Sequence, residues 1–524
     1  MNAQCIMVLG TTSGAGKSWL ATALCRSYAR QGLKVAPFKA QNMSNNARVV
    51  ASEGGQGEIG SAQYFQALAA RALPGVRMNP LLLKPEADTH SQVVLLGQVN
   101  AELTAMPWRE RSNHVWPHIV AALDELRAEN DVVVIEGAGS PAEINLHASD
   151  IVNMRVALHC NAACLLITDI DRGGAFAHLY GTWALLPANE RALIKGFVLN
   201  KFRGDVKLLA PAPQMLQELT QIPTVAVLPM WWQHGLPEED GVFDERSSAS
   251  GTVKLTVAVI VYPRISNLDE FQPLKNIPGV RLMWVRSPAE LAGLSPSDWL
   301  ILPGSKSTSA DLAWLRAQGL AAAVARHAGQ GGAVLGICAG LQMLGEALID
   351  PYGVAGNAPG LGLLPLVTVF EQDKIVCRTQ SAFAFSIAAP ALLDSDWVHG
   401  EVDVANPWAA LAGVTVTGYE IHQGVTRQHP AMAQAGDVAR AVLPDGLGWQ
   451  NAAGNVLGIY LHGLFEDPAA LQALFGSSLN GAVPTLEAVF ERMADFVEAH
   501  FEPGTLTALL AQDLTQNQTI STAV

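Results

Sequence analysis

Two short stretches carry a cysteine and a histidine in positions that suit nucleophilic catalysis. Residues 334–345, VLGICAGLQMLG, read as a buried strand that turns at Cys338 into a helix. Such an elbow exposes a nucleophile, and the positive end of the helix favours the reactive thiolate. Residues 456–465, VLGIYLHGLF, place His462 at the end of another apolar strand. A cysteine and a histidine at the ends of neighbouring strands make a nucleophile and its base.

A third stretch supplies donors for the negative charge that develops when a nucleophile attacks a carbonyl group. Residues 299–308, WLILPGSKST, run from an apolar strand into a Pro-Gly turn. We expect the backbone amides of Gly304 and Ser305, together with that of Ala339 beside the cysteine, to form an oxyanion hole.

Two further stretches have the residues of a nucleotide site. Residues 4–18, QCIMVLGTTSGAGKS, read as a strand, a glycine-rich loop and the start of a helix. In such a loop the backbone amides wrap phosphates, the lysine bridges to the terminal phosphate and the hydroxyl reaches Mg²⁺. Residues 131–146, DVVVIEGAGSPAEINL, read as a strand that ends at a carboxylate of Walker-B type, which binds Mg²⁺ directly or through water. The predicted residues are Gly14, Gly16, Lys17, Ser18 and Glu136.

Other polar residues follow the predicted strands of the same half. Side chains at the carboxyl ends of parallel strands face the ligand crevice. We therefore expect contacts to substrate carboxylates or phosphates from a set of basic and amide side chains, although each of them can equally be a solvated or ion-paired surface residue. The set is Lys39, Gln41, Asn42, Arg172 and Lys201.

The spacing of these motifs predicts the elements that must position them. Apolar strands that end in polar residues and alternate with helical patterns indicate an α/β fold with a doubly wound parallel sheet. We predict two such domains, each a mostly parallel sheet covered by helices, over residues 1–246 and 253–511, with a polar linker at 247–252 and a frayed tail at 512–524. The helical pattern of 485–511 is expected to pack on the second domain.

Composition narrows the function classes. The chain has 524 residues, 49% of them hydrophobic, and a formal net charge of −14. An acidic protein of this kind is not a general nucleic-acid or membrane-surface binder, because neutralising phosphates requires a basic face. No apolar run is long enough to cross a bilayer, and the six cysteines form no CxxC pair. We expect reduced thiols in a cytoplasmic protein with small-molecule substrates; a homo-oligomer is left open.

The motifs resemble known families. The order of strand with PGS, GICAGLQ and YLHG resembles the triad-type, or class I, glutamine amidotransferase domain, and GTTSGAGKS resembles the loop of dethiobiotin-synthetase-like ATPases. Further stretches, among them PFKAQNMSNNA, MNPLLLKP, DIDRGGAFA, NKFRGD, RISNLDEF and GYEIHQG, occur in order between residues 10 and 465. Together they resemble the cobyric acid synthase family, which amidates a corrinoid in cobalamin biosynthesis.

The resemblance implies a reaction and further roles. The family amidates the b, d, e and g carboxylates of adenosylcobyrinic acid a,c-diamide with ATP and glutamine, through an acyl phosphate and a thioester on Cys338. Similarity to dethiobiotin synthetase implies that Glu58 joins Ser18 and Glu136 at Mg²⁺ and that Asn200 faces adenine. Gln342 reads either as a contact to bound glutamine or as an ordinary exposed helical residue.

One departure and two alternatives remain. In the usual form of the amidotransferase domain a glutamate follows the histidine by two residues and orients it, whereas this sequence has Leu464. The orienting group is therefore absent or comes from elsewhere in the chain. The nearest alternative enzyme is cobyrinic acid a,c-diamide synthase, which has the same architecture. An alternative from another class is a non-enzymatic P-loop ATP switch.

Overall fold

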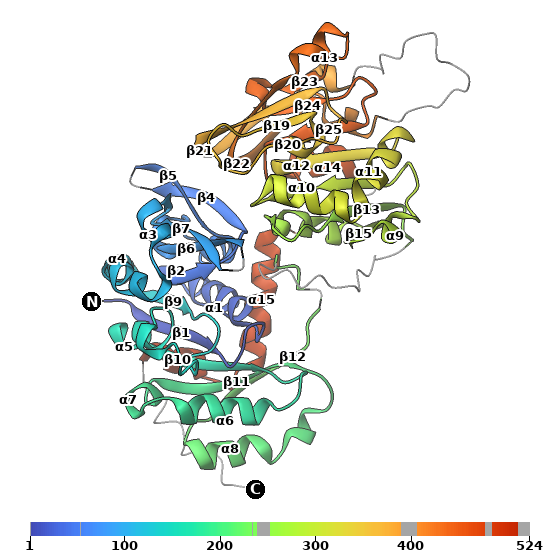
Figure 1. Ribbon diagram of the computed structural model, residues 1–524. Coiled ribbons are helices and arrows are strands. Elements are labelled where there is room, and N and C mark those ends of the chain that lie inside the picture. Colours follow the sequence, from blue (N-terminus) through green and yellow to red (C-terminus); the bar gives the residue numbers. More distant parts are fainter. Residues whose placement is uncertain are drawn as a thin grey trace.

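The computed structural model describes residues 2–52, 54–87, 89–232, 234–237, 252–388, 406–476 and 485–511. These residues form two α/β domains (Figure 1), as the sequence predicts. Most of the predicted linker, 247–251, and the predicted tail, 512–524, lie outside the described residues.

The first domain is built on a six-stranded parallel sheet in the order β12-β11-β10-β1-β9-β2. Its strands are almost wholly buried, because helices cover both faces, and this explains their continuous apolar sequences. The strands are β1 (Gln4–Gly10), β2 (Val35–Phe38), β9 (Val132–Glu136), β10 (Ala163–Asp169), β11 (Ile194–Phe202) and β12 (Thr224–Pro229).

Two groups of helices cover this sheet. One apolar core joins it to α1, α2, α15 and α16, and the other joins it to α4, α5 and α6. The helices are α1 (Lys17–Arg30), α2 (Ser61–Ala69), α3 (Ala101–Ala105), α4 (Trp108–Glu129), α5 (Met154–Cys160), α6 (Ala175–Leu185), α7 (Ala188–Arg191), α8 (Ala212–Thr220), α15 (Leu486–His500) and α16 (Thr505–Ala511).

Two small sheets extend the first domain. One has the order β3-β6-β7-β8, and the other is the hairpin β4-β5. Their strands are β3 (Gln41–Met43), β4 (Ala47–Ser52), β5 (Gly55–Gly60), β6 (Leu81–Ala87), β7 (His90–Leu95) and β8 (Gln98–Val99).

The second domain has a seven-stranded sheet in the order β15-β13-β16-β18-β25-β24-β23. The first five strands are parallel, and the last two continue the sheet antiparallel. They are β13 (Leu255–Ile260), β15 (Val280–Val285), β16 (Trp299–Leu302), β18 (Ala333–Ile337), β23 (Arg440–Leu443), β24 (Gly448–Gln450) and β25 (Val456–Ile459).

Helices cover both faces of this second sheet as well. One apolar core includes α10, α11 and α12, and the other includes α14 and the 3₁₀ helix η4 (Leu268–Asn276). The α-helices are α9 (Pro288–Leu291), α10 (Thr308–Ala317), α11 (Leu320–Gly329), α12 (Ala339–Leu344), α13 (Pro430–Gln434) and α14 (Pro468–Phe475). The remaining strands are β14 (Ile265–Ser266), β17 (Gly304–Ser305), β19 (Ala347–Ile349), β20 (Ala358–Pro359), β21 (Leu366–Ala382) and β22 (Thr415–Gln428).

The C-terminal helices lie on the first domain, so the expectation that 485–511 packs on the second domain is wrong. Helix α15 runs beside α1 (Figure 1), and the fully buried guanidinium of Arg26 pairs with Glu487 and Glu491 at 2.6 and 3.1 Å. The hydroxyl of Tyr28 donates to the carbonyl oxygen of Leu506, 3.0 Å away. An amphipathic helix shows from its sequence that one face is buried, but not which domain buries it.

The two domains meet where the β4-β5 hairpin faces the long β21-β22 hairpin (Figure 1). The backbone amide of Arg378 on β21 donates to the side chain of Gln56 on β5. Strands from both domains therefore reach each other across the boundary. In the part of the chain that the structure describes, no helix combines the length and apolar character needed to span a membrane.

Candidate active site

Cys338 lies at the elbow that the sequence predicts, between β18 and α12. Its backbone has φ 54° and ψ −107°, and a positive φ of this kind is strained for a residue with a side chain and is typical of functional sites. The elbow also depends on glycine, because a Cβ on Gly340 would lie 1.8 Å from the carbonyl oxygen of Leu302. Close packing of helix against strand therefore brings the thiol to the carboxyl end of the sheet.

His462 follows β25, the strand next to β18, and an acidic residue orients it. The Nδ1 atom of His462 lies 3.0 Å from Oε1 of Glu270, and the backbone N–H of Gly463 donates to Oε2 at 2.9 Å. The side chains of both His462 and Glu270 are buried. Glu270 therefore occupies the role that Leu464 leaves vacant in the sequence, and it comes from η4, far earlier in the chain.

The surroundings of His462 favour its charged form. Burial alone would lower the pKa of the imidazole, but the Glu270 carboxylate and the Cys338 side chain raise it to about 10. Tyr419 stacks on the imidazole with ring centroids 5.3 Å apart. A buried imidazolium between a carboxylate and a thiol can hold a thiolate and deliver a proton to a leaving group.

The predicted oxyanion residues lie next to this pair. A Cβ on Gly304 would lie 3.1 Å from Cε1 of His462 and 2.7 Å from Oγ of Ser266, so a side chain there would displace one or both of them. Ala339 is the first residue of α12, where backbone N–H groups have no partner within the helix. This placement is compatible with an oxyanion hole, and the role itself stays a prediction.

Gln342 is buried, so its interpretation as an exposed helical residue is wrong. Its side-chain oxygen accepts from Oγ1 of Thr308 at 3.1 Å, and its Nε2 donates to the hydroxyl of Tyr460 at 3.3 Å. It lies on the helix that begins after Cys338. Contact with a bound substrate stays a prediction.

The glycine-rich loop joins β1 to α1 and has the form expected of a phosphate site. Nζ of Lys17 donates to the carbonyl oxygens of Thr12 and Gly139 at 3.1 and 3.2 Å. A Cβ on Gly16, whose φ is +103°, would lie 2.1 Å from Nδ2 of Asn200. Asn200 donates to the carbonyl oxygen of Ala15 at 2.9 Å. The structure thus brings the loop and the predicted adenine contact together.

Glu136 ends β9 beside the loop, where four side chains donate to it. Oγ of Ser18 and Nζ of Lys39 both lie 2.8 Å from Oε1, and Nε2 of Gln63 and Nε2 of Gln66 lie 3.3 and 2.6 Å from Oε2. Burial would raise the pKa of Glu136, but Lys39 and these donors lower it. A carboxylate and a hydroxyl offer the hard oxygen atoms that Mg²⁺ prefers, so these residues fit that ion together with nucleotide phosphates.

Glu58, the third predicted metal ligand, binds lysines instead. Oε2 of Glu58 lies 2.6 Å from Nζ of Lys84, and Oε1 pairs with Lys374 of the second domain. Burial would raise the pKa of Glu58, but the two lysines lower it to about 2. The described side chains contain no cluster of three or more His, Cys, Asp or Glu arranged for a metal. The structure joins Ser18 to Glu136 but does not bring Glu58 into contact with either.

The remaining predicted contacts line the same edge of the first sheet. Nζ of Lys201 donates to the carbonyl oxygen of Gly14 at 2.9 Å and lies 3.1 Å from Asp169, and Arg172 lies 3.5 Å from the same carboxylate. Asn42 donates to Oε1 of Gln63 at 3.1 Å.

Gln41 and a nearby cavity complete this edge of the sheet. Gln41 is buried with no hydrogen-bond partner for Oε1. A cavity of about 320 Å³ opens beside the carboxyl ends of β10 and β11, and it is lined by Ile170, Asp171, Phe202 and Arg203. The lining is half apolar, and its two charged side chains, Asp171 and Arg203, pair with each other. Contact of Gln41 with a substrate stays a prediction.

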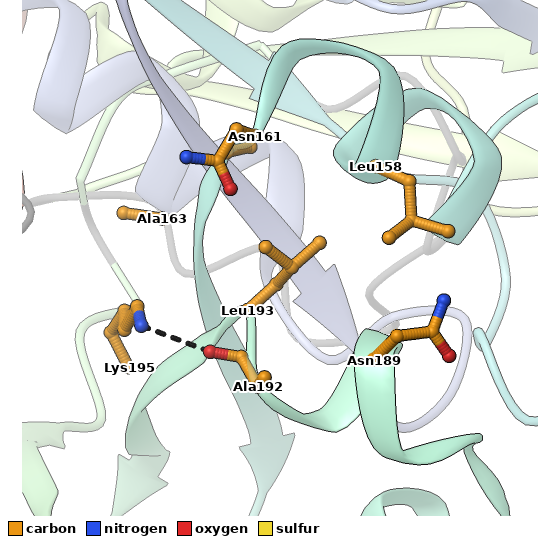
Figure 2. A pocket seen from close by; sticks show the side chains of 8 residues that line it. Leu158, Asn161, Ala163, Asn189, Ala192, Leu193 and Lys195 are labelled. Atoms are coloured by element: carbon orange, nitrogen blue, oxygen red, sulfur yellow. Dashed lines mark hydrogen bonds between the residues drawn. The ribbon is translucent and has the colours of Figure 1, made fainter.

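A second cavity lies at the opposite edge of this sheet. It measures about 300 Å³ and is bordered by the starts of β10 and β11 (Figure 2). Lys195 points its Nζ at the carbonyl oxygen of Ala192, 2.9 Å away. Because ligands of doubly wound sheets bind at the carboxyl ends of strands, this cavity is not part of the candidate site.

The two domains match two known families. Residues 6–233 match the CobQ/CobB/MinD/ParA nucleotide binding domain, and residues 256–470 match the CobB/CobQ-like glutamine amidotransferase domain. The chain is also similar along nearly its whole length to curated proteins named cobyric acid synthase.

Three of these relatives show the extent of the similarity. The protein from Albidiferax ferrireducens is 80% identical over 510 residues, which cover 97% of this chain and 100% of that protein. The proteins from Polaromonas naphthalenivorans and Variovorax paradoxus are 73% and 70% identical, each over 98% of this chain and 100% of the relative. A nucleotide site and a Cys–His–Glu site occur in one chain, and the similarity spans both domains; the chain belongs to the cobyric acid synthase family.

Proposed function

We propose that this chain uses ATP and glutamine to amidate the b, d, e and g carboxylates of adenosylcobyrinic acid a,c-diamide and so makes adenosylcobyric acid. The carrying observation is that one chain holds a buried Cys338–His462–Glu270 site and a P-loop with its carboxylate, Glu136. Its relatives of 70–80% identity carry the name cobyric acid synthase, which supports the substrate.

The second domain releases ammonia from glutamine. The thiolate of Cys338 attacks the side-chain amide carbon, and the amides of Gly304 and Ala339 stabilise the oxyanion. His462, protonated and held by Glu270, gives its proton to the leaving nitrogen, so that ammonia departs and a thioester remains. Water then attacks the thioester with His462 as base, which yields glutamate and restores the thiolate.

The first domain activates the substrate carboxylate. ATP supplies the phosphoryl group that turns a carboxylate oxygen into a leaving group. Ser18 and Glu136 would hold Mg²⁺, which would neutralise charge on the phosphates. Lys17 and the loop amides hold the terminal phosphates. The buried Lys39 pairs with Glu136 in the structure, and in this scheme it binds the carboxylate or the transferred phosphoryl group. Ammonia attacks the acyl phosphate and displaces phosphate.

Mass spectrometry of the corrinoid tests the substrate. Incubation of the a,c-diamide with protein, Mg-ATP and glutamine should give successive additions of amide groups that stop one carboxylate short of complete amidation. If the a,c-diamide stays unchanged while the unamidated corrinoid is converted, the protein is a cobyrinic acid a,c-diamide synthase. The alternative of a non-enzymatic ATP switch predicts no amidation of either corrinoid.

Two variants test the division of labour. Cys338→Ser should abolish glutamine-supported synthesis and leave synthesis with ammonium salts, because only the nitrogen source is lost. Lys17→Ala should stop synthesis from both nitrogen sources. Loss of both activities in Cys338→Ser would contradict the scheme of two separate sites. A cytoplasmic location belongs to the same proposal and accords with the six free cysteine thiols.

A further inference from the structure

A buried arginine of the first domain lies at the centre of the domain contact beside His462. Arg48 is on β4, and its side chain is 2% exposed. Its two terminal nitrogens donate to the two carboxylate oxygens of Glu466 at 2.7 and 2.6 Å, and one of them also binds Asp269. Both carboxylates belong to the second domain. A bidentate pair of this kind sets orientation as well as distance.

The two partners of Arg48 belong to the two segments that form the histidine–glutamate pair. Asp269 is the residue before Glu270 on η4. Glu466 lies in the turn after His462, where its backbone N–H donates to the carbonyl oxygen of Gly463 at 2.9 Å. One guanidinium thus ties the segment that carries the orienting carboxylate to the segment that carries the imidazole.

Neighbouring backbone contacts extend this attachment. The side-chain oxygen of Asn46 accepts from the backbone N–H of Leu268 at 3.1 Å. Nδ2 of Asn267 donates to the carbonyl oxygen of Ala47 at 3.0 Å and to the hydroxyl of Tyr419 at 2.7 Å. Because the ring of Tyr419 stacks on the imidazole of His462, the first domain also reaches the histidine by this second route.

Aromatic rings from both domains enclose the guanidinium. Its central carbon lies 5.1 Å from the ring centre of Phe65, 5.6 Å from that of Tyr64 and 5.2 Å from that of Tyr419. Cation–π contacts and two carboxylates compensate for the loss of water around the buried charge. The side chain is therefore held in one place rather than free to swing.

We propose that Arg48 is a positioning residue for glutamine hydrolysis: from the synthetase domain it aligns Glu270 with His462 in the amidotransferase domain. The inference rests on the proposed function, since it assumes that Cys338 and His462 hydrolyse glutamine. Arg48 follows Lys39 on one continuous segment, and Lys39 binds Glu136 in the nucleotide site. Residues 39–48 therefore contact the nucleotide site at one end, through Lys39, and the segments of Glu270 and His462 at the other end, through Arg48.

The test compares full-length variants of Arg48 in two assays, glutamine hydrolysis and amidation driven by ammonium salts. Arg48→Met should lower kcat for glutamine hydrolysis by about 10- to 100-fold, as expected for a displaced catalytic group, with little change in KM and with ammonium-driven amidation within about twofold of the parent. It should also move the alkaline limb of the pH–rate profile to lower pH, because His462 loses its alignment with Glu270. Arg48→Lys, which keeps the charge but not the fork, should recover part of kcat.

Two further variants keep the test decisive. Arg48→Met leaves two carboxylates without their partner, and Asp269→Asn neutralises the fully buried one, whereas Glu466 is 22% exposed. The double variant should therefore fold more readily than the single one while still breaking the link. The matched control is Arg26→Met, since Arg26 is also a fully buried arginine of the first domain bound to two glutamates. Its partners lie on α15 and not on the segments that carry Glu270 and His462, so its kcat should match the parent.

Two outcomes would overturn the proposal. One is a normal hydrolysis rate and pH profile in both Arg48→Met variants. The other is equal loss of both activities in the double variant, which would indicate a purely structural role. Failure of the proposed function itself appears separately, as glutamine hydrolysis that survives Cys338→Ser in an otherwise unchanged chain.

Discussion

The carboxylate of Glu270 should set the pH range in which glutamine hydrolysis works, and Glu270→Gln isolates that effect. The change replaces a charged partner of His462 by a neutral one of nearly the same shape. The atoms Nδ1 and Oε1 are 3.0 Å apart, and two unit charges at this separation attract by about 5 kcal/mol at an effective dielectric constant of about 20. One pKa unit corresponds to about 1.4 kcal/mol, and the new amide keeps a hydrogen bond, so the pKa of His462 should fall by about 2 to 3 units.

The direction of the change in the pH profile follows from which protonation state of His462 is active. With a pKa of about 10 in the folded protein, the imidazolium that holds the thiolate persists through neutral pH and is lost only as pH rises through that value. In Glu270→Gln the imidazolium is lost from about pH 7 upward. The variant should therefore have its alkaline limb near neutrality. At pH 8 the lost imidazolium should lower kcat by about 2- to 10-fold. The lost orientation of the ring adds to this, since exchanging the orienting aspartate of a serine-protease triad for asparagine costs about 10⁴-fold, so we expect a total fall of about 10²- to 10⁴-fold.

The assay is glutamate release from glutamine between pH 6 and pH 10, with ammonium-driven amidation as the measure of an intact synthetase domain. Glu190→Gln is the matched control, because Glu190 is a buried glutamate 2.9 Å from the ring nitrogen of His147 in the other domain. An unchanged rate and pH profile in Glu270→Gln would refute the assignment of Glu270 as the orienting group.

Three further predictions concern other parts of the chain. Gly16→Ala places a Cβ 2.1 Å from Nδ2 of Asn200 at a φ of +103°, so ATP affinity measured by calorimetry should fall by at least about 10-fold. The control is Gly181→Ala, because a Cβ at Gly181 would have no neighbouring atom within 4 Å. Gly304→Ala puts a Cβ 3.1 Å from the imidazole of His462 and should lower glutamine hydrolysis by about 10²-fold while ammonium-driven amidation persists. Burial raises the pKa of Glu58, but two lysines lower it more, to about 2 against an ordinary 4.5. The stability that this carboxylate contributes to the fold is therefore complete above pH 4.5 and is lost as pH falls toward 2. Lys374→Met should move the midpoint of acid unfolding, followed by circular dichroism, upward by about one pH unit.

Several site residues could be predicted because their signals are local. The strand before Cys338 and the helix after it are both visible as apolar periodicity, and the same holds for the loop that carries Lys17. Glycines such as Gly16 and Gly340 mark places where backbone conformation or close packing excludes a side chain. The elbow, the phosphate loop and the parallel sheets therefore follow from short stretches of sequence.

Glu270 was beyond such reasoning, although the motif RISNLDEF is conspicuous. Nothing in that motif tells which of its two adjacent carboxylates turns toward His462 and which toward Arg48. The sequence shows the missing acid as Leu464 but not its replacement. The pairing depends on how η4 packs against the turn after β25, which is a contact between distant parts of the chain.

For Glu58 the sequence predicted a role, that of a metal ligand, which the tertiary contacts of this residue do not support. Its position on the β4-β5 hairpin places it between Lys84 and Lys374 at the domain boundary. Similarity to dethiobiotin synthetase predicts a metal ligand at this position. In this structure the buried carboxylate is instead compensated by the two lysines that the fold places beside it.

Short stretches of the sequence predict a thiol at an elbow, a histidine at a strand end, a phosphate loop and two parallel sheets, because each depends on neighbouring residues and on periodicity. The tertiary structure alone shows that Glu270 pairs with His462, that Arg48 binds Asp269 and Glu466 across the domain boundary, and that α15 packs on the first domain. Those features arise from packing and charge pairing between segments hundreds of residues apart. A sequence shows that a segment has an apolar face or a charged side chain, but not which distant segment packs against it.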